Sequence, residues 1–183
     1  MDPAQSRDPD QPIGLALLGY GRMGQIHFSN AIRNSDVAVS YVLDEFPDNI
    51  AENIAGKCRH LKTIPSILPT GALETVLKDE NVDALLICVP SDKHEQLIHK
   101  GLKAGKHIFC EKPLTLDSNS TEKCYQLAEA CNRHLFCAVN RRFDAGYRRA
   151  QEVVSSGQIG RVQHLSLTLG DHPGVDYTQK TGL

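Results

Sequence analysis

A six-residue glycine motif constrains most strongly what this chain can fold into. Gly19-Tyr20-Gly21-Arg22-Met23-Gly24 follows the apolar run 13–18 and precedes a helical pattern that extends to about residue 33. Glycine permits a tight turn at position 19, close approach of the backbone to a ligand at position 21, and close packing of helix on strand at position 24. The start of a helix offers free N–H groups to a phosphate. In this strand–turn–helix context the motif predicts a dinucleotide-binding turn, and the alternative is a plain glycine turn.

An acidic residue ends the second apolar run of the chain. Asp44 follows the run 37–43 and lies about 20 residues beyond the glycine motif, where an acid can bind both hydroxyls of an adenosine ribose. Its charge would repel a 2′-phosphate, Glu45 would add to that repulsion, and no Lys or Arg stands beside Asp44. These residues favour NAD over NADP as the ligand. The alternative is a solvated aspartate at the end of a strand.

Apolar runs and helical patterns alternate along the first 139 residues. This alternation predicts an α/β fold with a mostly parallel sheet and helices on both of its faces. We expect strands at 13–18, 37–43, 82–89, 107–110 and 135–139, and helices at 22–33, from 47 onward, at 71–78, between 92 and 105, and at 119–132.

The pattern changes after residue 140. We expect a helix at 145–155, and residues 161–169 alternate in the manner of a half-buried strand of an antiparallel sheet. The sequence therefore predicts a disordered tail at 1–12, a first domain at 13–139 and the incomplete start of a second, α+β open-sheet domain at 140–183. That last segment is too short for an ordinary independent core.

Composition argues against two classes of partner. The chain has 183 residues, and its 20 Lys and Arg against 22 Asp and Glu leave no basic surplus to bind a nucleic acid. The longest apolar run, 84–89, is far shorter than the roughly 20 residues of a membrane-spanning helix. The six cysteines form no C-x-x-C pair. We therefore expect no membrane segment, no metal site, and reduced thiols in a cytoplasmic protein.

Polar groups also follow the third predicted strand. Val89, Pro90 and Ser91 end this run, and an open α/β sheet holds its ligand at the carboxyl ends of its strands. We expect Pro90 and Ser91 to line the nicotinamide side of a bound cofactor, and Val89 to contact the cofactor as well. His94 lies near the start of the next helix, where it either binds the cofactor or caps the helix.

Glu111-Lys112-Pro113 follows the predicted strand 107–110. A lysine at a strand end that faces a cleft can donate a hydrogen bond to a substrate oxygen and stabilise developing negative charge. Spacing alone favours the alternative that Lys112 is an ordinary surface lysine.

The triplet and its neighbours resemble the glucose–fructose oxidoreductase/inositol dehydrogenase/MocA family of NAD(P)-dependent oxidoreductases. The resemblance extends over about residues 13–183 and implies a Rossmann domain, that is, a doubly wound parallel sheet, followed by an open-sheet domain. The matching pieces stand in family order: GYGRMG at 19–24, VDALLICVPSDKH at 82–94, AGKHIFCEKPL at 104–114, VNRRFDAGYRRA at 139–150 and GQIGRV at 157–162.

The resemblance implies roles for individual residues. The lysine of the triplet is catalytic in the family, which points to Lys112, while Glu111 would help to orient it and Pro113 would shape the turn, often through a cis bond. The cofactor-binding residues expected from motif and resemblance together are Gly19, Gly21, Arg22, Met23, Gly24, Asp44, Val89, Pro90, Ser91, His94, Glu111 and Asn140. The residues expected to face substrate are Arg141, Asp171 and His172.

The resemblance also implies a substrate class. The segments NRRFDAGY at 140–147 and VDY at 175–177 look most like those of inositol dehydrogenases. The expected reaction is therefore the NAD-dependent oxidation of a CH–OH group of a cyclic polyol or sugar, with a homo-oligomer as the full-length form. The alternatives are an NADP-dependent sugar or dihydrodiol dehydrogenase and an inactive, NAD-binding regulatory isoform.

One departure from the family concerns its general base. Family members place a catalytic Asp, with a His four residues later, after a Gly-rich segment of the second domain, and this chain stops at 181–183, about where that segment begins. We therefore expect a chain truncated before the pair. It is then a fragment of a longer dehydrogenase, a short isoform that binds NAD without turnover, or a chain whose site a partner completes.

Overall fold

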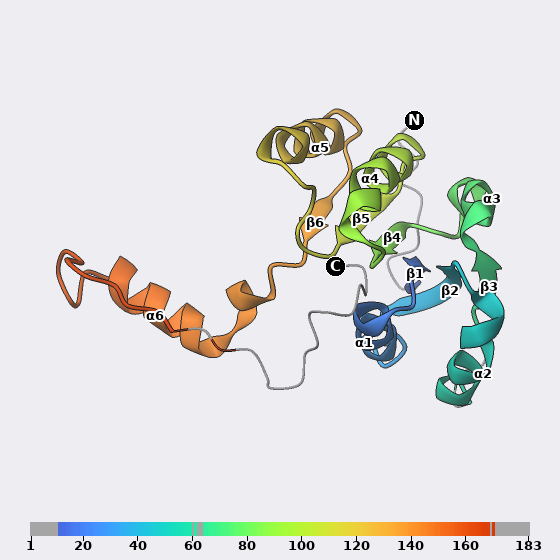
Figure 1. The fold of residues 1–183 in the computed structure, drawn as a ribbon, viewed down its shortest axis with the longest axis horizontal. Coiled ribbons are helices and arrows are strands. Elements are labelled where there is room, and N and C mark those ends of the chain that lie inside the picture. Colours follow the sequence, from blue (N-terminus) through green and yellow to red (C-terminus); the bar gives the residue numbers. More distant parts are fainter. Residues whose placement is uncertain (1–10, 60, 62–63, 169, 171–183) are drawn as a thin grey trace. The chain divides into compact units, whose positions relative to one another are not determined.

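The computed structural model contains a six-stranded sheet with the strand order β3-β2-β1-β4-β5-β6 (Figure 1). It describes residues 11–59, 61, 64–168 and 170. Every neighbouring pair of strands is parallel. The strand order reverses at β1, which lies between β2 and β4. Such a switch point opens a crevice at the carboxyl ends of the strands.

Strands and helices alternate along the first part of the chain, as expected. The strands are β1 (Ile13–Leu18), β2 (Val37–Asp44), β3 (Ser66–Pro69), β4 (Ala84–Ile87), β5 (His107–Cys110) and β6 (Leu135–Cys137). The helices are α1 (Arg22–Ala31), α2 (Pro47–Lys57), α3 (Leu73–Lys78), α4 (His94–Lys103), α5 (Ser118–Ala130) and α6 (Ala145–Ser155), with the short 3₁₀ segments η2 (Thr70–Ala72), η3 (Ser91–Lys93) and η4 (Asn140–Phe143).

Successive side chains of β1 enter two separate cores. Ala16 and Leu18 pack in the core that includes α3, α4 and α5, whereas Leu15 and Leu17 pack in the core that includes α1 and α2 (Figure 1). Because helices cover both faces, a strand of this sheet is apolar on both sides. This explains the continuous apolar runs of the sequence and confirms the prediction of helices on both faces.

The edge strand β3 was not predicted. Its four residues pair with the end of β2, from Tyr41 opposite Ser66 to Asp44 opposite Pro69. Only Ile67 and Leu68 are half-buried within it. Proline is typical of strand edges and turns, so a two-residue apolar signal ending at a proline does not stand out as a strand.

Contacts within the chain divide it after Ala138, and the second unit begins at Val139. Its helix α6 matches the prediction, and the Asp144 carboxylate caps it by accepting the N–H groups of Gly146 and Tyr147 at 2.9 and 3.1 Å. The predicted strand at 161–169 is wrong for its described part, since residues 161–168 form no strand and are exposed. Alternation of polar and apolar residues produces a strand only when another strand pairs with it, and no described residue does so here.

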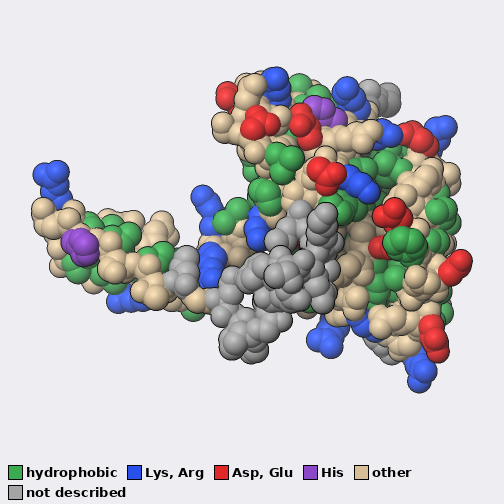
Figure 2. All heavy atoms as spheres, in the orientation of Figure 1, with side chains coloured by type: hydrophobic (Ala, Val, Ile, Leu, Met, Phe, Trp, Pro, Cys, Tyr) green, Lys and Arg blue, Asp and Glu red, His purple; other side chains and the backbone are tan. Residues whose placement is uncertain are grey.

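The surface of the described residues agrees with the balanced composition. Lys and Arg side chains are interspersed with Asp and Glu over the face of the first unit in Figure 2. None of the described helices has both the length and the apolar character needed to cross a membrane. The predicted tail at 1–12 lies almost wholly outside the described residues.

Candidate cofactor and catalytic site

The glycine turn joins β1 to α1 through close backbone contacts. Gly19 has a φ of +91° and donates its N–H to the carbonyl oxygen of Leu43 at 2.7 Å. A Cβ at Gly24 would collide with the carbonyl oxygen of Gly19, so only glycine fits there. A Cβ at Gly21, in contrast, would meet nothing within 4 Å. The packing of the chain itself therefore does not require glycine at position 21, where the backbone is open to a ligand at the start of α1.

The Asp44 carboxylate is bonded into this turn. Its Oδ2 accepts the N–H of Tyr20 at 2.7 Å, and its Oδ1 accepts the N–H of Phe46 at 3.0 Å. A carboxylate oxygen has two lone pairs, so each oxygen of Asp44 retains capacity for a ribose hydroxyl. Asp44 is half-buried and is a structural part of the turn, which sets it apart from a freely solvated strand end.

The Tyr20 side chain anchors the glycine turn to the two helices that follow it. It is 3% exposed, and its hydroxyl donates to Oδ1 of Asn53 on α2 at 2.9 Å. Its ring lies edge-on to Phe28 of α1, and the Lys57 ammonium lies 5.5 Å from the ring centroid. Burial, and after it the nearby Cys58 thiol, raise the pKa of Tyr20 to about 12. The Tyr20 side chain thus links the glycine turn to α1 and α2. The motif could not predict this role, because it leaves the residue between its first two glycines unspecified.

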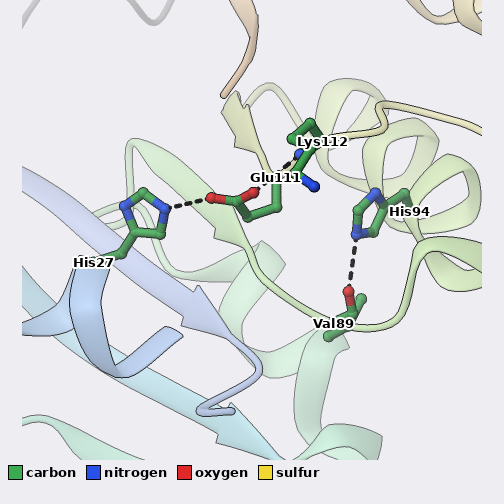
Figure 3. A network of polar contacts seen from close by, with 5 residues as sticks. All are labelled: His27, Val89, His94, Glu111 and Lys112. Carbon is green, nitrogen blue, oxygen red and sulfur yellow. Dashed lines mark hydrogen bonds and ion pairs between the residues drawn. The ribbon is translucent and has the colours of Figure 1, made fainter. Parts of the chain in front are cut away.

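The segment after β4 contains the half-buried Val89, Pro90 and Ser91. His94 is 1% exposed, and its Nε2 lies 2.9 Å from the carbonyl oxygen of Val89 (Figure 3). Its Nδ1 lies 2.8 Å from the carbonyl oxygen of Pro113. The capping alternative for His94 is wrong, and contact of His94 with a cofactor stays a prediction. Its side chain makes no capping bond to α4, and carbonyl oxygens of the protein occupy both of its ring nitrogens. His94 instead bridges the loop after β4 and the turn after β5.

The Glu111-Lys112-Pro113 turn follows β5, and its Lys112–Pro113 peptide bond is cis, as expected. Glu111 is 8% exposed. Its Oε1 lies 2.7 Å from Nε2 of His27, and its Oε2 accepts the N–H of Lys112 at 3.1 Å (Figure 3). The carboxylate thus orients the Lys112 peptide, while the Lys112 side chain is exposed. The catalytic role of Lys112 stays a prediction.

These groups lie at one edge of the sheet because their strands end level with one another. Leu18 pairs with both Leu43 and Ile87, and Ile87 pairs with Cys110. Directly after these four paired residues come the glycine turn, Asp44, the loop after β4 and the Glu111 turn. This edge is where an open sheet with a switch point binds an extended ligand.

The thiols at this edge are held in their protonated form. Burial raises the pKa of Cys88 to about 12 and raises that of Cys110 well above its ordinary range, and the Glu111 charge acts in the same direction. All six cysteines are free. A buried thiol without a positive partner is a poor nucleophile, so nucleophilic thiolate chemistry is not available here.

The remaining predicted site residues belong partly to α1 and partly to the second unit. Arg22 is exposed and Met23 half-buried in the first turn of α1. Asn140 and Arg141 lie on η4 in the second unit, both exposed, with the Arg141 guanidinium 5.4 Å from the centroid of the Tyr147 ring. The predicted substrate residues Asp171 and His172 lie outside the described residues. Within the described part of the chain, no group of three or more His, Cys, Asp or Glu side chains is arranged to hold a metal ion.

The residues present fit a dinucleotide. The open backbone at Gly21 and the free N–H groups in the first turn of α1 suit a pyrophosphate. The spare lone pairs of Asp44 suit ribose hydroxyls. Fold and turn together define a dinucleotide-binding domain of the Rossmann type.

Comparison with known proteins specifies the family. Residues 13–139 match the model of the GFO_IDH_MocA oxidoreductase family, described by its NAD-binding Rossmann fold. The chain belongs to this family, and its first unit is an NAD-binding Rossmann domain.

Several relatives are inositol dehydrogenases. The chain is 34% identical over 174 residues to inositol 2-dehydrogenase of Rhizobium meliloti, covering 93% of this chain and 49% of that enzyme. It is 30% identical over 170 residues to myo-inositol 2-dehydrogenase of Thermotoga maritima, covering 92% and 49%. Among solved structures, scyllo-inositol dehydrogenase from Lactobacillus casei with bound NAD(H) and scyllo-inositol is 29% identical with a TM-score of 0.70, covering 82% and 43%. The chain spans about half the length of these relatives.

Proposed function

We propose that this chain is the cofactor-binding part of an NAD-dependent oxidoreductase that oxidises a CH–OH group of a cyclic polyol, in the manner of an inositol 2-dehydrogenase. One observation carries the proposal. The glycine turn, Asp44 and the Glu111-Lys112 turn lie at the level carboxyl ends of adjacent parallel strands. That arrangement gives a dinucleotide and a polarising lysine a common site.

Each group has a distinct part in the proposed reaction. The glycine turn and the start of α1 bind the pyrophosphate, and Asp44 binds the adenosine ribose. NAD, when bound, supplies the hydride acceptor. Lys112 donates a hydrogen bond to the substrate oxygen and stabilises negative charge as the hydroxyl proton passes to a general base and the carbon-bound hydride passes to NAD. The family resemblance implies that this base is the Asp–His pair of the second domain.

The preference for NAD over NADP rests on the charge at Asp44. Its carboxylate is fixed by two backbone N–H groups, so it cannot easily turn away from a 2′-phosphate. Glu45 follows it, and no basic residue adjoins it in the sequence. An NADP-dependent sugar or dihydrodiol dehydrogenase is the second candidate among enzymes.

Substrate, domain boundary and assembly are further parts of the proposal. The inositol dehydrogenases among the relatives support a cyclic polyol. We also propose that residues 140–183 begin a substrate domain, to which Asn140, Arg141, Asp171 and His172 belong, and that the whole enzyme is a homo-oligomer. Cytoplasmic location stays a prediction.

The proposal is tested with a chimera that continues this chain with the corresponding second half of the Rhizobium meliloti enzyme. The expected result is formation of NADH from myo-inositol that the Lys112→Met variant abolishes. Turnover with NADP but not with NAD would favour the second candidate. Binding of NADH without oxidation of myo-inositol, scyllo-inositol or glucose would instead favour a regulatory NAD-binding protein.

A further inference from the structure

The Glu111 carboxylate is held from two sides. The Glu111 side chain is 11% exposed, and each of its carboxylate oxygens has its own partner. Oε1 lies 2.7 Å from Nε2 of His27, and Oε2 accepts the Lys112 N–H at 3.1 Å (Figure 3). A carboxylate with one partner can still rotate, whereas a carboxylate with a partner on each oxygen has a fixed plane. The orientation of the Lys112 peptide therefore depends on both bonds.

The ring of His27 is itself fixed by packing. Its side chain is 19% exposed. The ring lies edge-on to Phe109 of β5, with centroids 5.3 Å apart and an angle of 69° between planes, and Phe109 stacks on Phe136 of β6. Edge-on contact is a favoured arrangement of aromatic rings. Nε2 is thereby directed at the carboxylate, as Figure 3 shows.

His27 belongs to α1, the helix that begins at the glycine turn. Glu111 belongs to the turn that carries Lys112. One hydrogen bond therefore joins the element that receives the pyrophosphate to the element that carries the proposed polarising lysine. A shift of α1 on binding a dinucleotide would reach Lys112 through this bond.

The opposite flank of the turn is held in a different way. His94 contacts the carbonyl oxygen of Pro113 and has no bond to Glu111 among those of the described residues. The two histidines thus hold the same turn through separate atoms. Of these two histidines, His27 is the one that contacts the carboxylate that receives the Lys112 N–H.

We propose that His27 is a positioning residue for the reaction. It fixes the Glu111 carboxylate, and through it the Lys112 peptide, so that the lysine faces the cofactor edge of the sheet. This inference rests on the proposed function, since it takes the role of Lys112 from there. The glycine motif does not include His27, and the residue acts on Lys112 only through Glu111.

The test uses this chain and two readouts. The first is the Lys112 amide signal in a proton–nitrogen correlation spectrum, and the second is the Kd for NADH. The variants are His27→Leu, which lacks a donor, His27→Gln, which retains a nitrogen donor at similar reach, and Glu111→Ala. The matched control is His99→Leu on α4, because Nε2 of His99 has no hydrogen-bond partner in the described part of the chain.

The expected result is that His27→Leu and Glu111→Ala both move the Lys112 amide signal, because each removes one of the two bonds that fix the Glu111 carboxylate. The Kd for NADH changes little in His27→Leu, because the bond that is lost joins two protein side chains. His27→Gln and His99→Leu leave the signal in place. Adding His27→Leu to Glu111→Ala moves the Lys112 amide signal no further, because His27 acts through Glu111.

Three results would overturn the inference: an unmoved Lys112 amide signal in His27→Leu, a movement in His27→Gln equal to that in His27→Leu, or a further movement of the signal when His27→Leu is added to Glu111→Ala. Should His27→Leu fail to fold, His27→Asn replaces it, because the shorter side chain does not reach Glu111. Failure of the wild-type chain to bind NADH would count against the proposed function instead, and the amide comparison would still decide whether His27 orients Lys112.

Discussion

The backbone N–H of Tyr20 donates a 2.7 Å hydrogen bond to Oδ2 of Asp44, which joins the glycine turn after β1 to the end of β2. The residue proposed to select the adenosine ribose therefore also shapes the turn proposed to receive the pyrophosphate. Changing Asp44 tests both roles together, and comparison of two cofactors separates them.

Asp44→Ala should lower the preference for NADH over NADPH. The change removes the charge that repels a 2′-phosphate and the acceptor of a ribose hydroxyl. The Kd for NADPH divided by the Kd for NADH should therefore fall by roughly tenfold or more. The Kd for NADH itself should rise, since the Tyr20 N–H loses its acceptor. Fluorescence titration with each cofactor measures the ratio. Asp48→Ala in the first turn of α2 is the control, and a ratio equal to that of the control would contradict the assigned role.

Gly21 and Gly24 should respond to alanine in opposite ways. At Gly21 a methyl group meets open space, and φ is −65°. Gly21→Ala should therefore keep the free energy of unfolding within about 0.5 kcal/mol while it weakens NADH binding. At Gly24 the methyl group collides with the Gly19 carbonyl oxygen, so Gly24→Ala should destabilise the fold by about 1–3 kcal/mol.

Denaturant unfolding and NADH titration measure the two glycine effects separately. Gly56→Ala in α2 is the control, because its methyl group also meets open space, and it should stabilise the helix by about 0.5–1 kcal/mol. Unchanged NADH affinity in Gly21→Ala would show that no ligand approaches the backbone at that position.

Lys112→Met should separate binding from chemistry. In a chimera that oxidises a polyol, the variant should lose at least roughly 100-fold in kcat, the scale of a lost proton-transfer or polarising group. The Kd for NADH should change little, because the Lys112 side chain is exposed and its N–H bond to Glu111 is retained. Lys123→Met on α5 is the control. Loss of NADH binding with retained turnover in the remaining bound fraction would refute the polarising role.

Alkaline pH should weaken the anchoring of the glycine turn. Burial raises the pKa of Tyr20 from 10.0 to about 12. A group whose folded pKa lies above its unfolded value stabilises the fold below the unfolded pKa and loses that contribution as pH rises through the folded pKa. The stability difference between the wild type and Tyr20→Phe should therefore shrink between pH 10.0 and about 12.

Urea midpoints across that pH window measure the Tyr20 effect. Tyr125→Phe, at an exposed position of α5, is the control. The difference in urea midpoint between the wild type and Tyr20→Phe could instead stay constant throughout this pH window. That result would show that ionisation of the Tyr20 phenol has no part in the alkaline transition.

The sheet could be predicted from sequence because its strands are buried on both faces. The run 13–18 and the run 107–110 have the bounds of β1 and β5. The predicted strand at 161–169 failed because alternation identifies a face that could be buried, whereas pairing requires a partner strand. The Leu165 side chain, for example, is 80% exposed.

Backbone groups of the site were easier to predict than side-chain contacts. Gly19 and Gly24 follow from the steric needs of a tight turn, which a short motif encodes. The bond between His27 and Glu111 joins residues 84 positions apart, and His94 uses both ring nitrogens on backbone oxygens. Local spacing in the sequence does not encode such contacts, because they depend on the register between strands that are far apart in the sequence.

The most direct test of the account is a fluorescence titration of this chain with NADH, repeated with NADPH. The sequence contains no Trp, so cofactor emission can be followed without energy transfer from tryptophan. If this edge of the sheet holds NAD, the chain binds NADH saturably and with a lower Kd than NADPH, and Gly21→Ala weakens that binding. Equal affinity for the two cofactors would contradict the role of Asp44, and failure of the folded chain to bind either would contradict the central claim that this edge of the sheet holds NAD.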